Sequence, residues 1–510
     1  MSPLSRRQFL GVVGAAGAGL VGAVVIVPAL SPPASETRRL TSTAVLPPRF
    51  SRPLPIPPTL APDQRTSDTD FYTLTAKEGT LDVVPGATPI RGYDGMFPGP
   101  TIESRRGRAV VITHRNELDH PTVVHLHGGR TPHDSDGYPT DLILPPQGWD
   151  HTHPGAVAAG SRDYTYPLEQ RAAGLWYHDH WMDFTGPAVW AGLAGMHLHR
   201  DDEEAALPLP NGDREIPLMI TDRAFAEDGT MAYPSRDPSL HQPGVTDRYA
   251  DGVFGDTILV NGAPTPYLEV EAVRYRFRIL NASNARNYRL TLDPAPDDGV
   301  CFTQIGSDGG LLAAPQRLDS IYVVPAERFD VVVDFRRYRP GQTVTMTNRL
   351  GDGPTSQVMQ FRITRTAADE SHVPDRLSVV EQLDPADAVR TRSFNFTTVT
   401  RDGMTMYAIG GRLFDTEYVA ANPALGSTEI WEFTSPTQHP VHIHLSPHQV
   451  LDRDGGLEPE DQGWKDTVRL APHQKVRLII RFDGYRGRYV FHCHNLEHED
   501  MGMMANFDVV

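Results

Sequence analysis

The sequence predicts an all-β protein made of three β-sandwich domains. Its 45 prolines and 44 glycines are spread along 510 residues, a composition that favours many short strands and turns over long helices. A pattern of turn, alternating strand and polar stop occurs three times along the chain. The length also exceeds what one ordinary hydrophobic core contains, so about three domains are expected.

The repeated pattern supplies one equivalent strand to each domain. The first copy spans residues 93–116, the second 261–281, and a fainter third 409–433. In each copy, apolar and polar residues alternate with a period of two after a turn rich in glycine and proline. Side chains of a strand alternate between its two faces, so each copy is typical of a half-buried strand in a sandwich.

Two polar stretches divide the chain. The stretch at 200–213 holds four consecutive acidic residues, and a second stretch, at about 366–391, is rich in Asp, Ala and Arg. Boundaries between domains fall in exposed polar linkers of this kind. We therefore predict a leader and three domains, at 1–44, 45–200, 214–365 and 392–510.

The N-terminus has the layout of a twin-arginine export signal. Arg6 and Arg7 precede a weakly apolar run at 11–30, and a proline-rich segment follows it. A permanent membrane anchor is the alternative, because the run is about long enough to span a bilayer. Five glycines between residues 11 and 22 lower its apolarity and favour cleavage. We expect an exported protein, periplasmic or extracellular, without membrane attachment after removal of the signal.

The net charge limits the kinds of binding partner, and the cysteine content limits the number of disulfides. The formal net charge of −17 argues against nucleic acid as the main partner, because binding phosphates needs clustered Lys and Arg. A role in keeping an exported protein soluble is the simpler interpretation. Cys301 and Cys493 are the two cysteines, so at most one disulfide can form. If Cys493 binds a metal there is none, and Cys301 is then an inert buried thiol.

The last twenty residues predict that one strand serves two metal sites. Alternation sends Cys493 to one face and His492 and His494 to the other. His498 and Met503 follow closely, and two histidines, one thiolate and a weak axial methionine describe a blue-copper electron-transfer site. We expect His439 to be the second histidine, turned away from His442 by a bend at Pro440.

Four histidine pairs form the second constellation. Two pairs lie in the first predicted domain and two in the third, with similar separations of 53 residues (125 to 178) and 50 residues (442 to 492). The pairs are therefore expected on equivalent strands of two related domains, with both imidazoles of a pair on one strand face. Eight neutral imidazoles suit a cage for several copper ions. The pairs are His125 and His127, His178 and His180, His442 and His444, and His492 and His494.

Two further pairs at the same spacing have no counterpart in the third domain. They are His151 and His153, in a loop flanked by Pro and Gly, and His197 and His199, at the end of the first domain. We assign both pairs to the protein surface rather than to a metal site.

Together these motifs resemble the multicopper oxidases, in particular bacterial spore-coat laccases, bilirubin oxidases and phenoxazinone synthase. The resemblance covers nearly all of the chain after about residue 50 and includes the segments at 134–139, 305–311 and 463–467. It implies cupredoxin-like Greek-key domains and four copper ions. It also implies a type 1 site of His439, Cys493, His498 and Met503, a type 2 site of His125 and His442, and a type 3 pair held by His127, His178 and His494 and by His180, His444 and His492.

The resemblance also implies a reaction. A small-molecule donor would dock near the exposed edge of His498, and its electrons would pass through Cys493 to the histidine cluster, where dioxygen is reduced to water. Glu499 and Asp136 match acidic residues that relay protons in similar enzymes, and the alternative role for each is to orient a histidine.

The donor and the assembly stay open at this stage. Phenols, aromatic amines and tetrapyrroles are the donors expected for a laccase-type oxidase. The short loop at 452–462 and the compact region before His125 border the expected donor site and leave the choice open. A cuprous or metal-ion oxidase is the second hypothesis, and a non-catalytic envelope protein on the same scaffold is the third. The sequence gives no oligomeric state.

Overall fold

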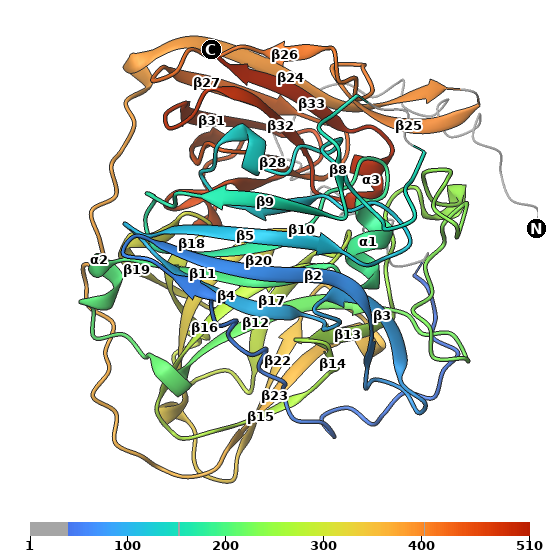
Figure 1. Cartoon of the computed structure of the whole chain (residues 1–510). Helices are drawn as coiled ribbons and strands as arrows, with labels where there is room; N and C mark the ends of the chain where they lie inside the picture. Colours follow the sequence, from blue (N-terminus) through green and yellow to red (C-terminus); the bar gives the residue numbers. More distant parts are fainter. Residues whose placement is uncertain (1–38, 151–153, 402) are drawn as a thin grey trace, which may run out of the picture.

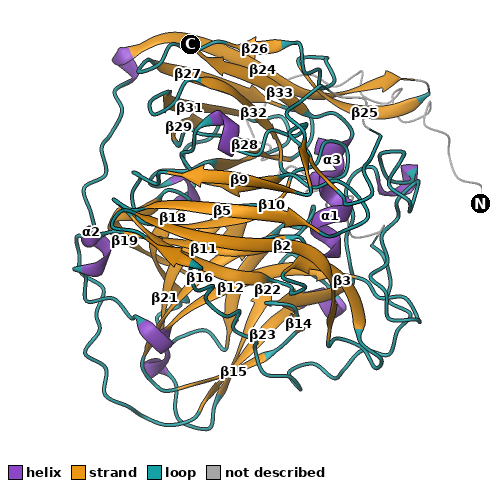
Figure 2. Ribbon diagram, viewed as in Figure 1, coloured by secondary structure: helices purple, strands orange, loops and turns teal. Residues whose placement is uncertain are grey.

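The computed structural model describes residues 39–510 except 151–153 and 402, so the predicted export signal lies outside the described residues. Strands dominate the described chain, which confirms the all-β prediction (Figure 2). Its α-helices are short: α1 (Thr185–Ala191), α2 (Asp202–Ala205) and α3 (Leu496–Asp500). Among these described residues, no helix has the length and apolarity needed to cross a membrane.

The large sheets draw their strands from three consecutive stretches of chain. The first stretch forms β1 (Gln64–Arg65), β2 (Thr69–Leu81), β3 (Thr88–Tyr93), β4 (Gly99–Arg105), β5 (Ala109–Asn116), β6 (Val124–His127), β7 (Ile143–Leu144), β8 (Ala158–Ala159), β9 (Ser161–Tyr166), β10 (Ala173–Asp179) and β11 (Ala194–Arg200). The second forms β12 (Glu215–Arg223), β13 (Thr257–Val260), β14 (Ala263–Pro264), β15 (Tyr267–Val270), β16 (Arg274–Asn281), β17 (Tyr288–Asp293), β18 (Phe302–Ser307), β19 (Gly310–Leu318), β20 (Ile321–Val323), β21 (Arg328–Asp334), β22 (Thr343–Asn348) and β23 (Gln357–Ile363). The third forms β24 (Ala388–Arg401), β25 (Met404–Ile409), β26 (Val419–Ala421), β27 (Thr428–Thr434), β28 (His439–Ile443), β29 (His448–Arg453), β30 (Thr467–Leu470), β31 (Lys475–Arg481), β32 (Gly487–Cys493) and β33 (Met504–Val509).

One sheet topology occurs three times. Strands β5, β16 and β27 each pair in parallel with the first long strand of their stretch, namely β2, β12 and β24. Each also pairs antiparallel with a later strand, β9, β21 or β31. These three strands are the alternating strands of the repeated sequence pattern, so the predicted equivalence is confirmed.

Figure 1 shows how the three units are arranged. The blue strands of the first stretch cross the middle of the view, the yellow-green strands of the second lie below, and the orange and red strands of the third lie above. The second linker has no regular structure from residue 364 to 384 and runs along one side of the molecule from the second unit to the third. The first linker is not all irregular, because it contains α2. The predicted domain limits themselves stay a prediction.

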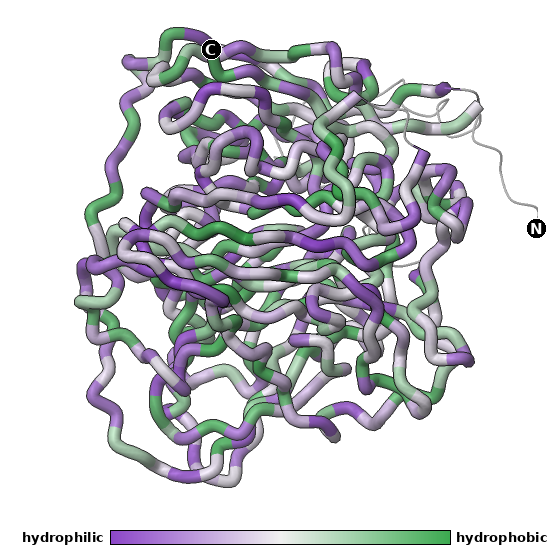
Figure 3. Tube along the Cα trace, viewed as in Figure 1, coloured by the Kyte–Doolittle hydropathy of each residue, from purple (hydrophilic) through white to green (hydrophobic). Residues whose placement is uncertain are grey.

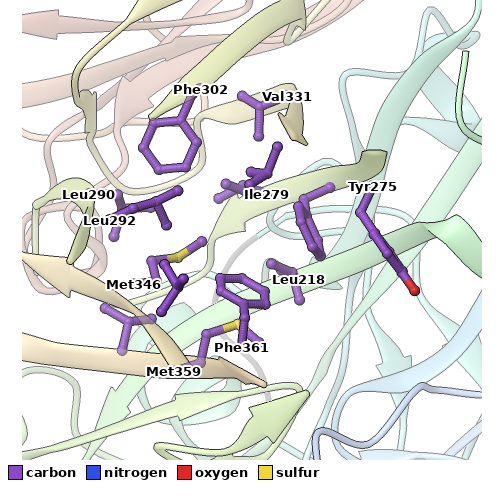
Figure 4. Close-up of a cluster of buried hydrophobic side chains, with 14 of the residues drawn as sticks. Leu218, Tyr275, Ile279, Leu290, Leu292, Phe302, Val331, Met346, Met359 and Phe361 are labelled. Carbon is purple, nitrogen blue, oxygen red and sulfur yellow. The ribbon is translucent and has the colours of Figure 1, made fainter. Parts of the chain in front are cut away.

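Each unit has its own hydrophobic core. Figure 4 shows the core of the second unit, where Phe302, Met346 and Phe361 pack with the other labelled apolar side chains between the two sheets. Hydrophobic and hydrophilic residues intermingle along the same strands in Figure 3, as expected when one strand face is buried and the other is exposed. Cys301 belongs to this core as a free thiol, as predicted.

A buried network of charges joins the first unit to the second. Arg276 and Arg278 on β16 contact Glu204 of α2, Glu215 of β12 and Asp330 of β21. Burial raises the pKa of Glu215, but Arg278, Arg276 and Arg200 outweigh this effect and lower it to about 2. The ionised carboxylate is therefore part of the folded state.

We expect Glu215→Gln to lower the stability of the protein by about 3 kcal/mol at neutral pH, because it leaves buried arginines without one of their counter-charges. The pKa of Glu215 is depressed on folding, so its contribution is fully present above its ordinary pKa of 4.5 and is lost as pH falls through about 2. Calorimetry at several pH values measures this as a gap between the wild-type and variant melting temperatures that shrinks below pH 4.5. Glu103→Gln removes an exposed partner of Arg200 and should shift the melting temperature little. An equal shift for both variants would contradict the proposed role of burial.

Candidate metal centre

The four histidine pairs lie where the repeated topology brings two units together. In the first unit, β10 pairs with β6, and His178 stands opposite His125. In the third, β32 pairs with β28, and His492 stands opposite His442. The predicted placement of the pairs on equivalent strands is therefore confirmed.

The C-terminal strand serves two sites, as predicted. The Cys493 sulfur points toward His439 and His498, whereas His492 and His494 point toward the histidines of the first unit. The expected bend at Pro440 is wrong, because β28 is one unbroken strand from residue 439 to 443 and residues 439–442 pair with β30 without a register shift. His439 and His442 are three positions apart, and alternation alone sends them to opposite faces.

Three ligand atoms converge at the first site. The His439 Nδ1 atom lies 3.3 Å from the Cys493 sulfur, the His498 Nδ1 atom 3.6 Å from it, and the two nitrogens 3.1 Å from each other. All three residues are buried. The chain of Met503 is held at this site, because its carbonyl accepts the Cys493 N–H and its own N–H donates to the His498 carbonyl. One thiolate, two imidazoles and a neighbouring thioether form a donor set that suits copper.

The second site is a cage of eight buried imidazoles contributed by the first and third units. Their ring nitrogens form three groups in which every ligand atom lies within 4.8 Å of the others. The groups are His127, His178 and His494; His180, His444 and His492; and His125, His442 and His444. The first two equal the predicted type 3 ligand sets, and the third contains the predicted type 2 pair. The assignment of each group to a copper type stays a prediction.

Hydrogen bonds fix which nitrogens face the centre of the cage. The Nδ1–H groups of His125 and His442 donate to the backbone carbonyls of Asp136 and Asp466, at 2.5 and 2.9 Å. Their Nε2 atoms are consequently unprotonated and face each other at 3.4 Å. Two lone pairs at this distance repel each other unless a cation lies between them. The residues therefore fit a bound metal ion.

A second set of contacts orients the imidazoles of His180, His444 and His492. The Nε2 atoms of His180 and His444 lie 3.3 and 3.2 Å from the Nε2 atom of His492. On the outer side, the His444 Nδ1–H donates to Asp136 Oδ2 at 2.7 Å, and Glu499 faces the Nδ1 atoms of His180 and His492 at 3.3 and 3.0 Å. Such contacts orient imidazole ligands and raise their basicity.

Both predicted acidic residues thus touch histidine ligands. Burial raises the pKa of Asp136. Burial also raises the pKa of Glu499, but His492, His180 and the Thr185 hydroxyl outweigh it and lower the pKa to about 2. An ionised Glu499, with its oxygens 3.3 and 3.0 Å from the Nδ1 atoms of His180 and His492, favours the orienting role, while the relay role stays a prediction for both residues.

The sequence reasoning missed a third acidic group. Asp466 accepts the Nε2–H of His127 at 3.0 Å, and its carbonyl accepts His442, so it orients ligands from both units. Arg328 of the second unit forms a buried ion pair with Asp466 and, despite the opposing effect of burial, lowers the pKa of this carboxyl. The motif at 463–467 that carries the family resemblance contains Asp466 and is the signal that could have identified it.

Burial also sets the protonation states at the site. It lowers the pKa values of His178 and His439 to about 3 and that of His180 to about 4, so these rings are neutral ligands at neutral pH. Burial raises the pKa of Cys493, which disfavours the thiolate in the metal-free protein. Metal binding at this sulfur therefore releases a proton.

The expected exposed edge of His498 is wrong. Only 4% of His498 is accessible, because the Tyr407 ring stacks on the imidazole at 3.7 Å between centroids. The Tyr407 hydroxyl donates to the exposed Asp251 carboxylate at 3.2 Å, and the Asn495 amide donates to the Asp251 carbonyl at 3.1 Å. The structure thus covers this imidazole with residues from the second and third units, which are far apart in sequence.

The structure contradicts the surface assignment of His197 and His199. His197 and His199 on β11 are fully buried, and both rings bond the Ser104 hydroxyl, at 2.7 and 2.8 Å. Their assignment to the surface is wrong because β11 is covered on both faces and lies between β4 and β10. Neither ring belongs to a ligand group among the described residues. His151 and His153 lie outside the described residues.

This fold and these two ligand sets define a copper-dependent oxidase. Three multicopper oxidase family models match the chain, at residues 75–204, 234–368 and 382–510. The chain belongs to the multicopper oxidase family, whose members have cupredoxin-like domains, bind four copper ions and use electron donors and dioxygen. The resemblance inferred from the motifs is thereby confirmed.

Named relatives share most of the chain. It is 38% identical to a laccase of Bacillus subtilis, with 90% of this chain and 98% of that protein covered. It is 33% identical to a bilirubin oxidase of Albifimbria verrucaria, with 94% and 85% covered. Among solved structures, a laccase from Pediococcus acidilactici superposes with a TM-score of 0.80 at 32% identity, with 92% and 96% covered.

Proposed function

We propose that this protein is a laccase-type oxidase that takes single electrons from phenols, aromatic amines or tetrapyrroles and reduces dioxygen to water. The placement of Cys493 carries the proposal, because its sulfur belongs to one ligand set while its chain neighbours His492 and His494 belong to the other. Bound copper supplies one-electron transfer at the sulfur site and dioxygen reduction at the histidine cage. The similarity to laccases and to a bilirubin oxidase supports this class of donor.

The protein's own residues hold the two sites rigid. The peptide units on either side of Cys493 are the shortest covalent connection between the ligand sets. Asp136, Asp466 and Glu499 hold the imidazoles of the cage in fixed orientations. Because all three acidic side chains are buried, water does not compete for these contacts.

The direct test is oxygen uptake by copper-loaded protein given a generic phenolic donor, with peroxide assayed in the same vessel. We expect four donor electrons to be consumed for each dioxygen, without free peroxide. A peroxide yield equal to the oxygen consumed would contradict the reduction to water. With copper confirmed bound, absence of uptake would refute the proposed donors and direct attention to metal ions or to the non-catalytic alternative.

The Tyr407 cover over His498 leads to a prediction on donor size. We expect Tyr407→Ala to raise kcat/KM for a bulky phenolic donor by about tenfold, because removing the ring opens the imidazole face. Ferrocyanide, a small donor that needs no ring contact, should be affected much less. Tyr407→Phe keeps the cover and serves as the control. A fall in the rate with both donors would show that Tyr407 conducts electrons rather than blocks access.

Oxidation of cuprous or other metal ions is the alternative function. A metallo-oxidase of Campylobacter jejuni shares the fold at 23% identity, which does not establish its activity for this chain. Oxygen uptake with cuprous ion as the only donor separates the two functions, and a clear preference for the phenol favours the laccase type.

We also propose export by the twin-arginine route to the periplasm or beyond. The proposal rests on Arg6, Arg7 and the glycine-rich run at 11–30. Replacing both arginines by lysine should retain the protein in the cytoplasm, as fractionation of the producing cells would show.

A further inference from the structure

Arg328 of the second unit lies beside the histidine cage, at a point where all three units meet. It is the first residue of β21 and is buried. Its Nε–H donates to the Gly174 carbonyl of the first unit at 3.0 Å, and its Nη1–H donates to Asp466 Oδ1 of the third unit at 2.7 Å. Among the described residues, the second unit contributes no member to any ligand group, yet Arg328 connects the two units that do.

The contact with Asp466 holds both oxygens of the carboxylate. The Arg328 Nη2–H donates to Asp466 Oδ2 while Nη1–H donates to Oδ1, a two-pronged contact that fixes the plane of the carboxylate. Arg328 is held in turn, because Nη1 also donates to the Ala326 carbonyl at 2.9 Å. The Asp308 carboxylate joins the two segments, since it accepts the backbone N–H of Arg328 at 2.8 Å and that of Asp466 at 3.3 Å. Both sides of the contact are therefore anchored.

His127 presents a different nitrogen to the cage from that of His125 and His442. In those two rings Nδ1 carries the hydrogen, so Nε2 is free. In His127 the hydrogen is on Nε2, which donates to Asp466 Oδ1 at 3.0 Å, and the buried Nδ1 atom has no hydrogen-bond partner. The Thr467 hydroxyl, 3.2 Å from the same Nε2, donates to the same Asp466 oxygen. The acceptor on one imidazole nitrogen selects which nitrogen can bind a metal, so Asp466 makes Nδ1 the ligand atom of His127.

Asp466 also holds a ligand of the third unit. Its backbone carbonyl accepts the Nδ1–H of His442 at 2.9 Å, and the His127 and His442 rings stack with 3.7 Å between centroids. By distance alone, Asp466, His127 and His442 could themselves hold a metal ion. The ring nitrogens that face Asp466 both carry hydrogens, however, and the positive charge beside this carboxylate is that of Arg328. The arrangement is consequently a support for two ligands rather than a separate metal site.

We propose that Arg328 is a positioning residue of the metal centre, which holds Asp466 so that His127 and His442 are oriented for copper. Without the guanidinium, the Asp466 carboxylate would be a buried charge without its bidentate partner, and less restrained against turning away from His127. The second unit thereby sets how tightly the histidine cage retains copper. The ligand group around Cys493 includes neither ring and should not depend on Arg328. The proposal concerns copper retention and requires no particular electron donor.

The test compares copper retention in wild-type and Arg328→Gln protein, both loaded with copper and dialysed against increasing concentrations of a chelator. Total copper and blue absorption per chain are measured at each step. The family binds four copper ions, so loss from the cage lowers total copper while the absorption of the Cys493 site persists. We expect Arg328→Gln to lose cage copper at a chelator concentration about 10–100-fold below that of the wild type, as is typical when a residue that orients a ligand is removed. No donor is present, so failure of this test is distinct from failure of the oxidase proposal.

Arg453→Gln is the matched control. Arg453 is also buried, and its guanidinium donates to both oxygens of Asp461, at 2.7 and 2.6 Å, but neither residue belongs to a ligand group of the described chain. This variant loses an equivalent ion pair and should retain copper as the wild type does. Arg328→Lys keeps the charge without the two-pronged contact, so its copper retention should be intermediate.

Partial rescue by Arg328→Lys, with the blue absorption of both Arg328 variants unchanged, is the result that supports the proposal. Copper retention of Arg328→Gln at the level of the wild type would overturn it, as would a loss no greater than that of Arg453→Gln. Joint loss of total copper and blue absorption in Arg328→Gln and Arg328→Lys would overturn it as well, because Arg328 would then support the fold rather than the cage.

Discussion

Replacing Cys493 by serine should abolish both the intense blue charge-transfer absorption and the oxidase activity. The blue colour of such a site arises from a copper–thiolate bond, and a serine hydroxyl does not supply that bond at neutral pH. The same change removes the sulfur that joins the two ligand sets. The fold should survive, because the serine oxygen can accept the Asn495 N–H that now donates to the sulfur at 3.4 Å. Absorption spectra, oxygen uptake and circular dichroism of one preparation measure these three effects.

Cys301→Ser is the matched control. Both cysteines are buried free thiols, but Cys301 lies in the core of the second unit beside Thr291 and touches no ligand set. This variant should stay blue and active, with only a modest loss of stability from burying a hydroxyl. A Cys493→Ser protein that remained blue would show that another residue provides the sulfur ligand. Loss of colour in both variants would point to a folding defect instead.

Most of the metal centre was predictable because its geometry is local. Alternation along a strand fixes the relative directions of His492, Cys493 and His494 whatever the rest of the chain does. The same rule places His439 opposite His442, so the bend at Pro440 was an unnecessary assumption. The similar spacing of the pairs in two units then predicted that four such strands belong together, and the registers of β6 with β10 and β28 with β32 agree.

What the sequence did not predict depends on contacts between distant segments. Tyr407 and Asp251 cover His498, yet these residues come from different units and have no shared spacing. The Arg328 contact with Asp466 likewise crosses a domain boundary. His197 and His199 carry the spacing of a ligand pair, but burial in β11 gives them Ser104 as a partner instead. Periodicity shows which side chains share one face of a strand, and only the packed structure shows which residues that face contacts.

The roles of the acidic residues near the ligands also depend on contacts that the sequence does not show. Asp136 and Glu499 were selected by their matching positions in a family, whereas the structure shows which histidines each side chain contacts. Asp136 holds two ligands, His444 through its side chain and His125 through its carbonyl. The two oxygens of Glu499 lie at ion-pair distance from the Nδ1 atoms of His180 and His492, at 3.3 and 3.0 Å. Replacing one carboxylate oxygen of Glu499 therefore tests a defined pair of contacts.

We expect Glu499→Gln to leave reduction by the donor unchanged and to slow reoxidation by dioxygen by about 10–100-fold. Glutamine offers one acceptor oxygen where glutamate offers two, and its amide N–H groups would face an imidazole N–H of His180 or His492. Neither ring belongs to the ligand group of His439, Cys493 and His498, so reduction at that site should not change. Stopped-flow absorption measures the two half-reactions separately, the first under anaerobic conditions and the second after mixing with oxygen.

Glu497→Gln provides the control for that experiment and helps to separate the two roles of Glu499. Glu497 is buried on the same helix, but it bonds Asn284, Tyr233 and the Val253 N–H rather than a ligand histidine. Its substitution should therefore leave reoxidation unchanged. If Glu499 orients ligands, Glu499→Gln should also lower copper retention during dialysis against a chelator. If it relays protons, copper retention should stay normal and the slow reoxidation should show a solvent deuterium isotope effect. Reoxidation at the wild-type rate would exclude both roles.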